Sequence, residues 1–444
     1  MRIHLIAIGG SAMHNLALAL QANGHDVSGS DDEIYDPAHS RLKENGLLPD
    51  SVGWSAARID PEIDIVIVGM HARPDNPELL KAIELGLEIH SYPSYLYQHA
   101  RKKERIVVGG SHGKTTTTAI IMHVLQKSNT SFDYLVGAQL AGFDHMVHLS
   151  DAPLMVLEGD EYLSSPLDTR SKFLHYKPQL AILTGIAWDH INVFPTFESY
   201  LDTFRQFIQG MESNGFLFYY GEDPALQEMV KHAPEGLTCI PYRGFDSGKS
   251  PGTVNLEGME VSWPLFGAHN RQNLQAAWLV CKQLGIPKVQ FAAAIQDFAG
   301  PSLRMQQLVS TEKLTVFRDF AHAPSKLRAS IQAIRTEFPN KKLKAVFELH
   351  TFSSLNKSFL PDYQNTMDPA DKAVVFYLPH TLEMKRMPAL APDFIRKAFQ
   401  REDLIVLTST EDLKNWLDKE REEGGVFAMM SSGNFGKLPK WYEL

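Results

Sequence analysis

The sequence predicts an α/β protein of three domains, on three observations. At 444 residues the chain exceeds a single hydrophobic core and fits two to four domains of roughly 100 to 200 residues each. Short apolar runs, typical of buried strands, alternate with helical patterns, which favours mostly parallel sheets. Glycine turns follow the first strands of the N-terminal and central parts, where such sheets bind ligands. We expect domains at 1–100, 101–302 and 303–444.

Composition and charge exclude several classes of protein. With 43 Lys and Arg against 52 Asp and Glu, the net charge of −9 disfavours non-specific binding to nucleic acid. The two cysteines, Cys239 and Cys281, are too few for a disulfide framework and fit a reducing compartment. No signal peptide is recognisable, and no segment reaches the ~18 apolar residues of a membrane span. We expect a cytoplasmic protein without nucleic-acid or membrane partners, and the sequence indicates no oligomeric state.

The N-terminal segment begins like a Rossmann-type nucleotide-binding domain. An apolar strand at 2–8 leads through two adjacent glycines to a helical pattern at 13–25 and a second strand at 26–31. The glycines are not spaced as G-x-G-x-x-G, which disfavours an NAD site.

Further strand and helix patterns complete this first domain. Asp31 ends the second strand, where an acid often meets a ribose hydroxyl, although an ordinary turn fits equally well. A buried strand at 63–70 and a turn and helix at 71–86 follow, and the domain ends near a basic linker at 101–105.

The central segment opens with a candidate phosphate-binding loop. A strand ending at Gly110 leads into a helix over 111–128, with Gly113, Lys114 and Thr115 at its start. Backbone N–H groups and the positive end of a helix dipole bind phosphates in this arrangement. We expect the lysine to reach the β- and γ-phosphates and the threonine hydroxyl to hold magnesium, although the loop is shorter than the full G-x-x-x-x-G-K-[ST] pattern.

Acidic residues follow the next strand of the central segment. The strand at 154–162 delivers Glu158, Asp160 and Glu161. Magnesium takes one or two protein carboxylates together with phosphates and water, so these acids are candidate ligands, with an ordinary acidic turn as the alternative.

A second strand of the central segment, at 178–190, repeats the arrangement with Asp189 and His190. A histidine beside an acid at such a strand end is a candidate functional residue. A structural histidine is the alternative.

A helix at 266–285 carries Asn270 and Asn273 in its first turn. Residues three apart share a helix face, so the two amides can present themselves to a purine edge or cap the helix.

The last segment predicts a second Rossmann-like domain. A strand ends in Asp319 and is followed by a turn with His322 and a helix. Polar loops after two later strands, "ELHTFSSLN" and "MMSSGNFGK", are candidate ligand sites because open parallel sheets bind ligands at these ends. The further strands are expected within 343–354, 372–379, 403–409 and 424–436.

Six motifs in order, "GGSHGKTTTT", "LEGDEY", "DH", "FGAHNRQN", "LRMQQL" and "RDFAHAPSKL", resemble the Mur ligase family. The resemblance covers nearly the whole chain. It implies a UDP-sugar-binding domain, a central phosphate-loop ATPase domain and a C-terminal domain for the amino substrate. It also implies amide formation through an acyl phosphate, with ATP and Mg²⁺.

Within the family, "DTRSKFLHYKP" resembles the members that act on the murein tripeptide, and "ELHTFSSLN" lacks the His-Arg loop usual in the members that add L-alanine. The resemblance therefore implies that the chain joins L-alanyl-γ-D-glutamyl-meso-diaminopimelate to UDP-N-acetylmuramate in peptidoglycan recycling. Two alternatives stay open. One is the ligase that adds L-alanine, and the other is a regulator that binds nucleotide or UDP-sugar without catalysis.

The resemblance also implies roles for single residues. Lys114 holds the ATP phosphates, Thr115 and Glu158 the first magnesium ion, and His190 the second, so that Lys114, Glu158 and His190 are the catalytic positions. The other cofactor-binding positions are Gly110, His112, Gly113, Thr116, Asn270, Asn273, Arg304, Asp319 and His322. The candidate substrate-binding positions are Gly10, Ser11, Ser30, Asp31, His350, Ser353, Ser354 and Asn434.

One feature of some Mur ligases, a carboxylated lysine after the "DH" motif, is missing from the sequence. No lysine occurs between Lys177 and Lys231, which excludes a carbamate ligand in that segment.

Overall fold

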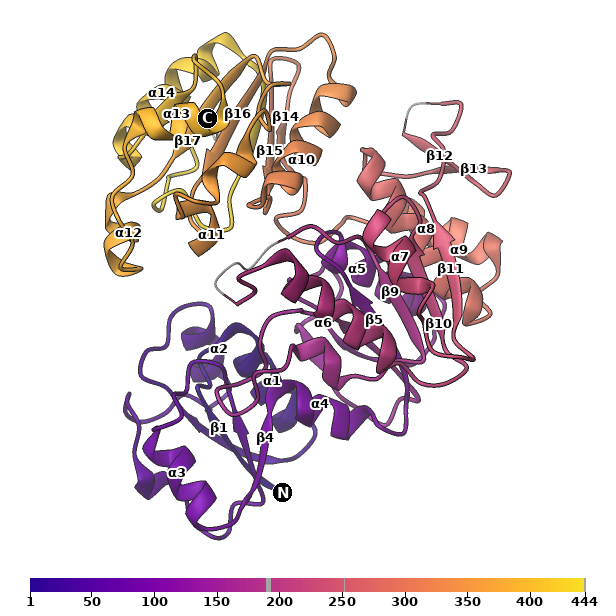
Figure 1. Ribbon diagram of the computed structural model, residues 1–444, viewed down its shortest axis with the longest axis vertical. Coiled ribbons are helices and arrows are strands. Elements are labelled where there is room, and N and C mark those ends of the chain that lie inside the picture. The colour runs from indigo at the N-terminus through magenta and orange to yellow at the C-terminus, as the bar shows by residue number, and fades with distance from the viewer. Residues whose placement is uncertain (189–192, 251, 443–444) are drawn as a thin grey trace. The chain divides into compact units, whose positions relative to one another are not determined.

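The α/β class is confirmed by the structure, a computed structural model that describes residues 1–188, 193–250 and 252–442. Within these residues the strands form sheets of four, seven and six strands, mostly parallel, and one two-stranded hairpin (Figure 1). None of the described helices is long and apolar enough to cross a membrane.

The N-terminal sheet is entirely parallel, with strand order β2-β1-β3-β4. The first strand is shorter than the predicted 2–8 because Ala7, at φ 69°, already belongs to the turn. Its strands are β1 (Arg2–Ile6), β2 (Asp26–Ser30), β3 (Ile65–Val68) and β4 (Glu88–Ser91). Its helices are α1 (Ser11–Ala22), α2 (Ala38–Glu44), the 3₁₀ turn η1 (Ala56–Arg58), α3 (Pro77–Glu84) and α4 (Tyr92–Ala100).

The central sheet has the order β11-β10-β9-β5-β8-β6-β7, and only β7 runs antiparallel to its neighbour. Ile106, Val107 and Val108 of β5 are fully buried, as expected for a central strand covered on both faces. The strands are β5 (Glu104–Gly109), β6 (Asp133–Leu135), β7 (Val147–His148), β8 (Leu154–Glu158), β9 (Leu180–Leu183), β10 (Phe216–Tyr220) and β11 (Thr238–Tyr242).

Helices α5 (Lys114–Lys127), α6 (Phe197–Gln209), α7 (Pro224–Val230), α8 (Ala268–Gln283) and α9 (Lys288–Ala294) also belong to the middle of the chain. The 3₁₀ turns η2 (Lys172–His175) and η3 (Ile295–Asp297) and the hairpin of β12 (Thr253–Leu256) and β13 (Met259–Ser262) lie there as well.

The basic segment 101–105 is more than the predicted linker, because Arg105 is a core residue of β5 and only 1% exposed. Its guanidinium donates to five backbone carbonyls and to the Glu212 carboxylate. Lys103 is also buried, with its ammonium 2.7 Å from the Asp133 carboxylate. The run of charges in the sequence does not reveal this burial, since the carboxylates of Glu212 and Asp133 and the carbonyls of Tyr176 and Lys177 come from distant parts of the chain.

The C-terminal sheet has the order β14-β15-β19-β16-β17-β18, and only the edge strand β14 is antiparallel. Alternate residues of its strands enter two hydrophobic cores, one on each face: Phe347 joins one and Val346 the other. The strands are β14 (Gln306–Ser310), β15 (Leu314–Asp319), β16 (Leu343–Glu348), β17 (Lys372–Phe376), β18 (Ile405–Leu407) and β19 (Gly425–Met430). The helices are α10 (Pro324–Glu337), α11 (Phe352–Leu355), η4 (Leu360–Tyr363), α12 (Pro379–Met384), α13 (Pro392–Phe399) and α14 (Thr410–Glu423).

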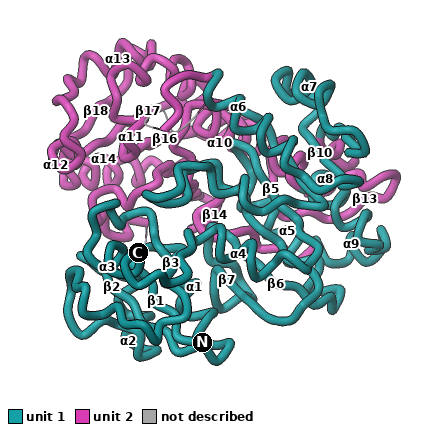
Figure 2. The backbone as a smooth tube through the Cα atoms, turned by 60° about the horizontal axis from the view of Figure 1, so that its bottom comes forward, with its two compact units in different colours: residues 1–186, 198–243, 274–295 teal, residues 187–197, 244–273, 296–444 magenta. Residues whose placement is uncertain are grey.

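The chain divides into two compact units (Figure 2). Unit 1 comprises residues 1–186, 198–243 and 274–295 and contains the N-terminal and central sheets. Unit 2 comprises residues 187–197, 244–273 and 296–444 and contains the hairpin and the C-terminal sheet.

Candidate active site

The predicted loop between β5 and α5 has the backbone of a phosphate-binding turn. Gly110 and Gly113 both have positive φ, at 118° and 71°, which glycine adopts without the strain of a side chain. A Cβ atom on Gly110 would also collide with the Thr184 side chain. The turn therefore depends on both glycines, and it leads directly into α5 at Lys114.

The Lys114 ammonium lies at the start of α5. Its Nζ atom donates to the Gly110 carbonyl over 2.6 Å and to Oε2 of Glu161 over 2.8 Å. Burial alone would lower the pKa of Lys114, but the carboxylates of Glu161 and Asp160 outweigh burial and raise it. The lysine thus carries its positive charge at the carboxyl edge of the sheet.

The three carboxylates predicted after β8 have three different partners. Glu158 accepts from Thr115, Asp160 pairs with Lys172 at 2.6 Å, and Glu161 pairs with Lys114. The predicted strand 154–162 ends already at Glu158, so Asp160 and Glu161 belong to the loop that follows it.

Thr115 and Glu158 form a pair of hard oxygen donors. The Thr115 hydroxyl donates to Oε1 of Glu158 over 2.7 Å, and the Gly137 backbone N–H donates to Oε2 over 2.6 Å. A hydroxyl and a carboxylate oxygen next to a phosphate loop fit Mg²⁺, which takes few protein ligands and completes its shell with phosphate and water. Among the described residues no group of three or more His, Cys, Asp or Glu side chains forms a metal cage.

The predicted second metal position, His190, and the neighbouring Asp189 lie outside the described residues. The strand predicted to deliver them, β9, ends at Leu183. Of the other predicted residues of the loop, His112 accepts a hydrogen bond from Thr184 through its carbonyl, and Thr116 is buried in the first turn of α5.

The glycine turn of the N-terminal sheet is joined to the end of β2 by Asp31. Its Oδ2 atom accepts from the Gly9 N–H over 2.7 Å, and burial, with Asp32 beside it, raises the pKa of Asp31 to about 6. Gly10 precedes α1, and Ser11 is exposed at the first position of that helix. Three of the four predicted sugar-site residues, Gly10, Ser11 and Asp31, therefore lie at one edge of this sheet.

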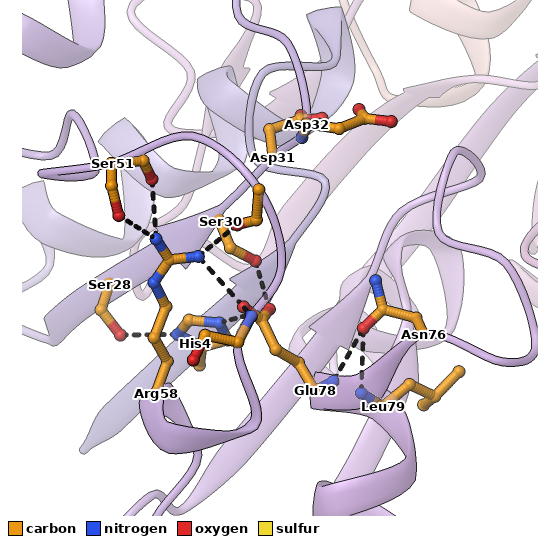
Figure 3. Close-up of polar contacts among 12 residues, drawn as sticks. His4, Ser28, Ser30, Asp31, Asp32, Ser51, Arg58, Asn76, Glu78 and Leu79 are labelled. Atoms are coloured by element: carbon orange, nitrogen blue, oxygen red, sulfur yellow. Dashed lines mark hydrogen bonds and ion pairs between the residues drawn. The ribbon is translucent and has the colours of Figure 1, made fainter.

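Ser30 lies below that edge rather than on it. It is fully buried, and its hydroxyl donates to Oε2 of Glu78 (Figure 3). Glu78, itself 0% exposed, also accepts from the Ser55 N–H at 2.9 Å and from Arg58 at 3.2 Å, and lies 3.3 Å from His4 Nε2.

Sequence reasoning missed this network of buried polar residues. A signal exists, since Glu78 lies four residues before the buried Ala82 on α3 and so shares its inward face. Arg58 extends the network by donating to the Ser51 carbonyl (Figure 3). It also donates to the Gly53 carbonyl.

The other predicted nucleotide residues belong to unit 2. The Asn270 amide donates to the Phe266 carbonyl over 2.8 Å, and the Asn273 amide approaches Asn270 Oδ1 at 3.4 Å. Both side chains are buried, and these two hydrogen bonds lie at the start of α8.

Asp319 ties the end of β15 to the preceding loop. Its Oδ1 atom accepts from the Met305 N–H over 3.1 Å. Arg304 lies with its guanidinium 4.6 Å from the ring centre of Phe320, and His322 Nδ1 is 2.9 Å from the Phe320 carbonyl. Arg304, Asp319 and His322 therefore meet around one strand end.

The C-terminal candidate residues lie in two loops of unit 2. Ser353 and Ser354 are buried in the short helix α11, and the Ser354 hydroxyl accepts from the His350 N–H over 3.1 Å. Asn434 is exposed, and its Oδ1 atom accepts from the Lys437 N–H. The loop of Asn434 is held by the buried Glu348, which accepts from the Phe435 N–H over 2.9 Å.

Fold and site together define a nucleotide-dependent α/β enzyme with a phosphate loop on its central sheet. Residues 2–104 match the Mur ligase family, catalytic domain, and residues 108–281 match the Mur ligase middle domain. The chain belongs to the Mur ligase family, whose members are ATP-dependent ligases that form C–N bonds and act in peptidoglycan synthesis.

Relatives of the chain include ligases with two different amine substrates. A UDP-N-acetylmuramate–L-alanine ligase of Desulforamulus reducens is 30% identical over 379 residues, 81% of this chain and 79% of the relative. A UDP-N-acetylmuramate–L-alanyl-γ-D-glutamyl-meso-2,6-diaminoheptandioate ligase of Escherichia coli is 27% identical over 450 residues, 99% and 96% of the two chains. The crystal structure of a murein peptide ligase from Psychrobacter arcticus shares the fold, with a TM-score of 0.70, 24% identity and coverage of 99% and 97%.

Proposed function

We propose that this Mur ligase joins L-alanyl-γ-D-glutamyl-meso-diaminopimelate to UDP-N-acetylmuramate in the cytoplasm, as a step of peptidoglycan recycling. The observation that carries the ligase chemistry is the placement of Lys114, Thr115 and Glu158 around one phosphate loop. The E. coli relative supports the tripeptide as the amine. A second candidate, ligation of L-alanine, is favoured by the D. reducens relative at similar identity.

In the proposed first step the lactyl carboxylate of the sugar attacks the γ-phosphorus of ATP. A carboxyl O–P bond forms and the bond to the ADP oxygen breaks. Lys114, fixed at the helix start, neutralises charge on the transferred phosphoryl group, and the N–H groups at the start of α5 face the phosphates. Thr115 and Glu158 would hold Mg²⁺, which supplies further neutralisation of phosphate charge.

In the second step the α-amine of the incoming alanyl residue attacks the acyl carbon. The C–N bond forms, inorganic phosphate leaves, and the amine nitrogen gives up a proton. An α-amino group has a pKa of about 8, so a sizeable fraction is neutral at physiological pH and a strong base is not required.

We also propose functional domains at 1–100 for the UDP-sugar, 101–302 for ATP and 303–444 for the amine. The separate sheets in these segments support this assignment. Gly10, Ser11 and Asp31 are proposed to serve the sugar nucleotide. In unit 2 the proposed nucleotide residues are Asn270, Asn273, Arg304, Asp319 and His322, and the proposed amine residues are His350, Ser353, Ser354 and Asn434.

The test is phosphate release from ATP with UDP-N-acetylmuramate and magnesium, comparing the tripeptide with L-alanine. Stimulation by the tripeptide alone supports the proposal. Stimulation by L-alanine alone supports the second candidate, ligation of L-alanine, instead. Phosphate release that neither amine stimulates contradicts ligation.

A further inference from the structure

A buried carboxylate, Glu161, forms an ion pair with Lys114, the lysine of the phosphate loop. Its Oε2 atom lies 2.8 Å from Lys114 Nζ, and the Glu161 side chain is only 1% exposed. The charged partner of Lys114 is therefore shielded from water, where a Coulomb interaction is several times stronger than at the surface.

Glu161 is held in this position from a second side. The Tyr200 hydroxyl, on α6, donates to Oε1 of Glu161 over 3.0 Å. Because a tyrosine has a single hydroxyl proton, the Ser111 hydroxyl, 2.8 Å away, is the donor to Tyr200. Ser111 belongs to the phosphate loop itself, so loop, carboxylate and helix form one connected network.

In this network Glu161 pairs with the positive charge of Lys114, which the nucleotide phosphates also require for binding. A polyphosphate carries several negative charges, and Lys114 is its cationic partner in the proposed function. Glu161 places a fixed negative charge beside that partner. Asp160 is close but is engaged by Lys172 at 2.6 Å, which leaves Glu161 as the carboxylate directly bonded to the lysine among those described.

We propose that Glu161 competes with the nucleotide phosphates for Lys114 and thereby weakens the binding of both ATP and ADP, so that ADP leaves after ligation. This inference rests on the proposed function, because it assumes that Lys114 binds phosphate. Glu161 acts through Lys114 and is a positioning residue rather than a catalytic one.

The test is the dissociation constant of ATP, and of ADP, measured by calorimetry on the full chain without magnesium or sugar substrate. Glu161→Gln keeps the size of the side chain and an oxygen that accepts from Tyr200, but removes the negative charge. We expect both nucleotides to bind about tenfold more tightly, and ADP to inhibit turnover more strongly. Unchanged or weaker binding would overturn the proposal.

Two further variants keep the result interpretable. Glu198→Gln removes the same charge from an exposed position on α6, 71% exposed, and leaves nucleotide affinity unchanged. Glu161→Asp retains the negative charge, so its nucleotide affinity stays close to that of the unmodified protein. Tighter binding by Glu161→Asp than by Glu161→Gln contradicts the proposal.

Failure of the proposed function gives a different result. Lys114→Met abolishes ATP binding if the loop is the nucleotide site. Wild-type affinity in Lys114→Met would refute that site, whereas loss in Lys114→Met with no gain in Glu161→Gln would refute only the competition. Thermal unfolding of each variant confirms that the chain is folded.

Discussion

The Thr115 hydroxyl donates a 2.7 Å hydrogen bond to Oε1 of Glu158. The bond joins the first turn of α5 to the last residue of β8, which pairs in parallel with β5, the strand that precedes α5. The relationship puts a hydroxyl and a carboxylate at the place where the phosphate loop ends, as a site for a hard cation requires.

Replacement of Glu158 therefore affects catalysis more than folding. In Glu158→Gln the amide still reaches Thr115 and Gly137, but one negative charge toward the cation is lost. We expect kcat/KM to fall about 100-fold and the magnesium concentration for half-maximal rate to rise. Steady-state phosphate release at several magnesium concentrations measures both.

Asp151→Asn is the matched control for that substitution, because Asp151 is exposed and precedes β8 at its opposite end. A loss of activity in Asp151→Asn equal to that in Glu158→Gln would contradict the site.

The buried Glu78 stabilises the N-terminal sheet in its ionised form. Burial alone would raise its pKa, but hydrogen bonds from His4 and Ser30 and the Ser55 N–H lower the pKa below its ordinary value of 4.5. A carboxyl whose pKa is lowered on folding stabilises the protein above the unfolded pKa, and the contribution disappears as pH falls through the folded pKa.

Glu78→Gln is accordingly expected to lower the free energy of unfolding by about 3 kcal/mol at neutral pH. The difference in the free energy of unfolding between Glu78→Gln and the unmodified protein becomes smaller as the pH falls below 4.5, because Glu78 then becomes protonated in the unmodified protein too. Urea unfolding at a series of pH values measures it. Glu84→Gln, on the exposed side of the same helix, serves as control, and a pH-independent deficit in Glu78→Gln would count against the ionised network.

Replacement of the buried Arg105 is expected to affect stability and not nucleotide binding. Its guanidinium is 1% exposed and satisfies five carbonyl groups at the start of β5. Arg105→Met leaves these acceptors and the Glu212 carboxylate without their donor, so we expect a loss of about 3 kcal/mol in the free energy of unfolding.

ATP affinity of folded Arg105→Met is expected to stay unchanged, because the phosphate loop lies at the opposite end of β5. Arg101→Met, with an exposed side chain, is the control for stability. Equal stability of the two variants would show that the carbonyl cluster contributes nothing.

Gly433 tests the C-terminal loops. A Cβ atom there would come within 2.9 Å of Glu348 Oε2 and of the His350 ring. Gly433→Ala therefore displaces His350, and we expect a rise of about fivefold or more in KM for the amine substrate, with the dissociation constant of ATP unchanged. If Gly433→Ala changes the affinity for ATP and does not change KM for the amine, His350 is not part of the amine site.

Local sequence patterns determined much of the architecture. Apolar runs of four to six residues, followed by glycine or an acid, placed β1, β5, β8 and β15 close to their observed positions. The glycine turn of the candidate phosphate-binding loop was also readable, because the need for positive φ at Gly110 and Gly113 is a local backbone property. Strand ends were overestimated where apolar residues continue past the last strand residue, as at Ala7 and Ile8 after β1 and at Ile186 and Ala187 after β9.

Tertiary structure alone decided which charged side chains meet. Lys114 and Glu161 are 47 residues apart, and Arg105 and Glu212 are 107 apart, and no local pattern specifies either contact. Charges near one another in sequence, such as Glu158, Asp160 and Glu161, were separated onto different partners by the turn after β8. The sequence by itself determined the elements and the phosphate loop, since these follow from periodicity and backbone freedom. The pairing of buried charges depends on the packing of distant strands and helices, which only the folded chain brings together.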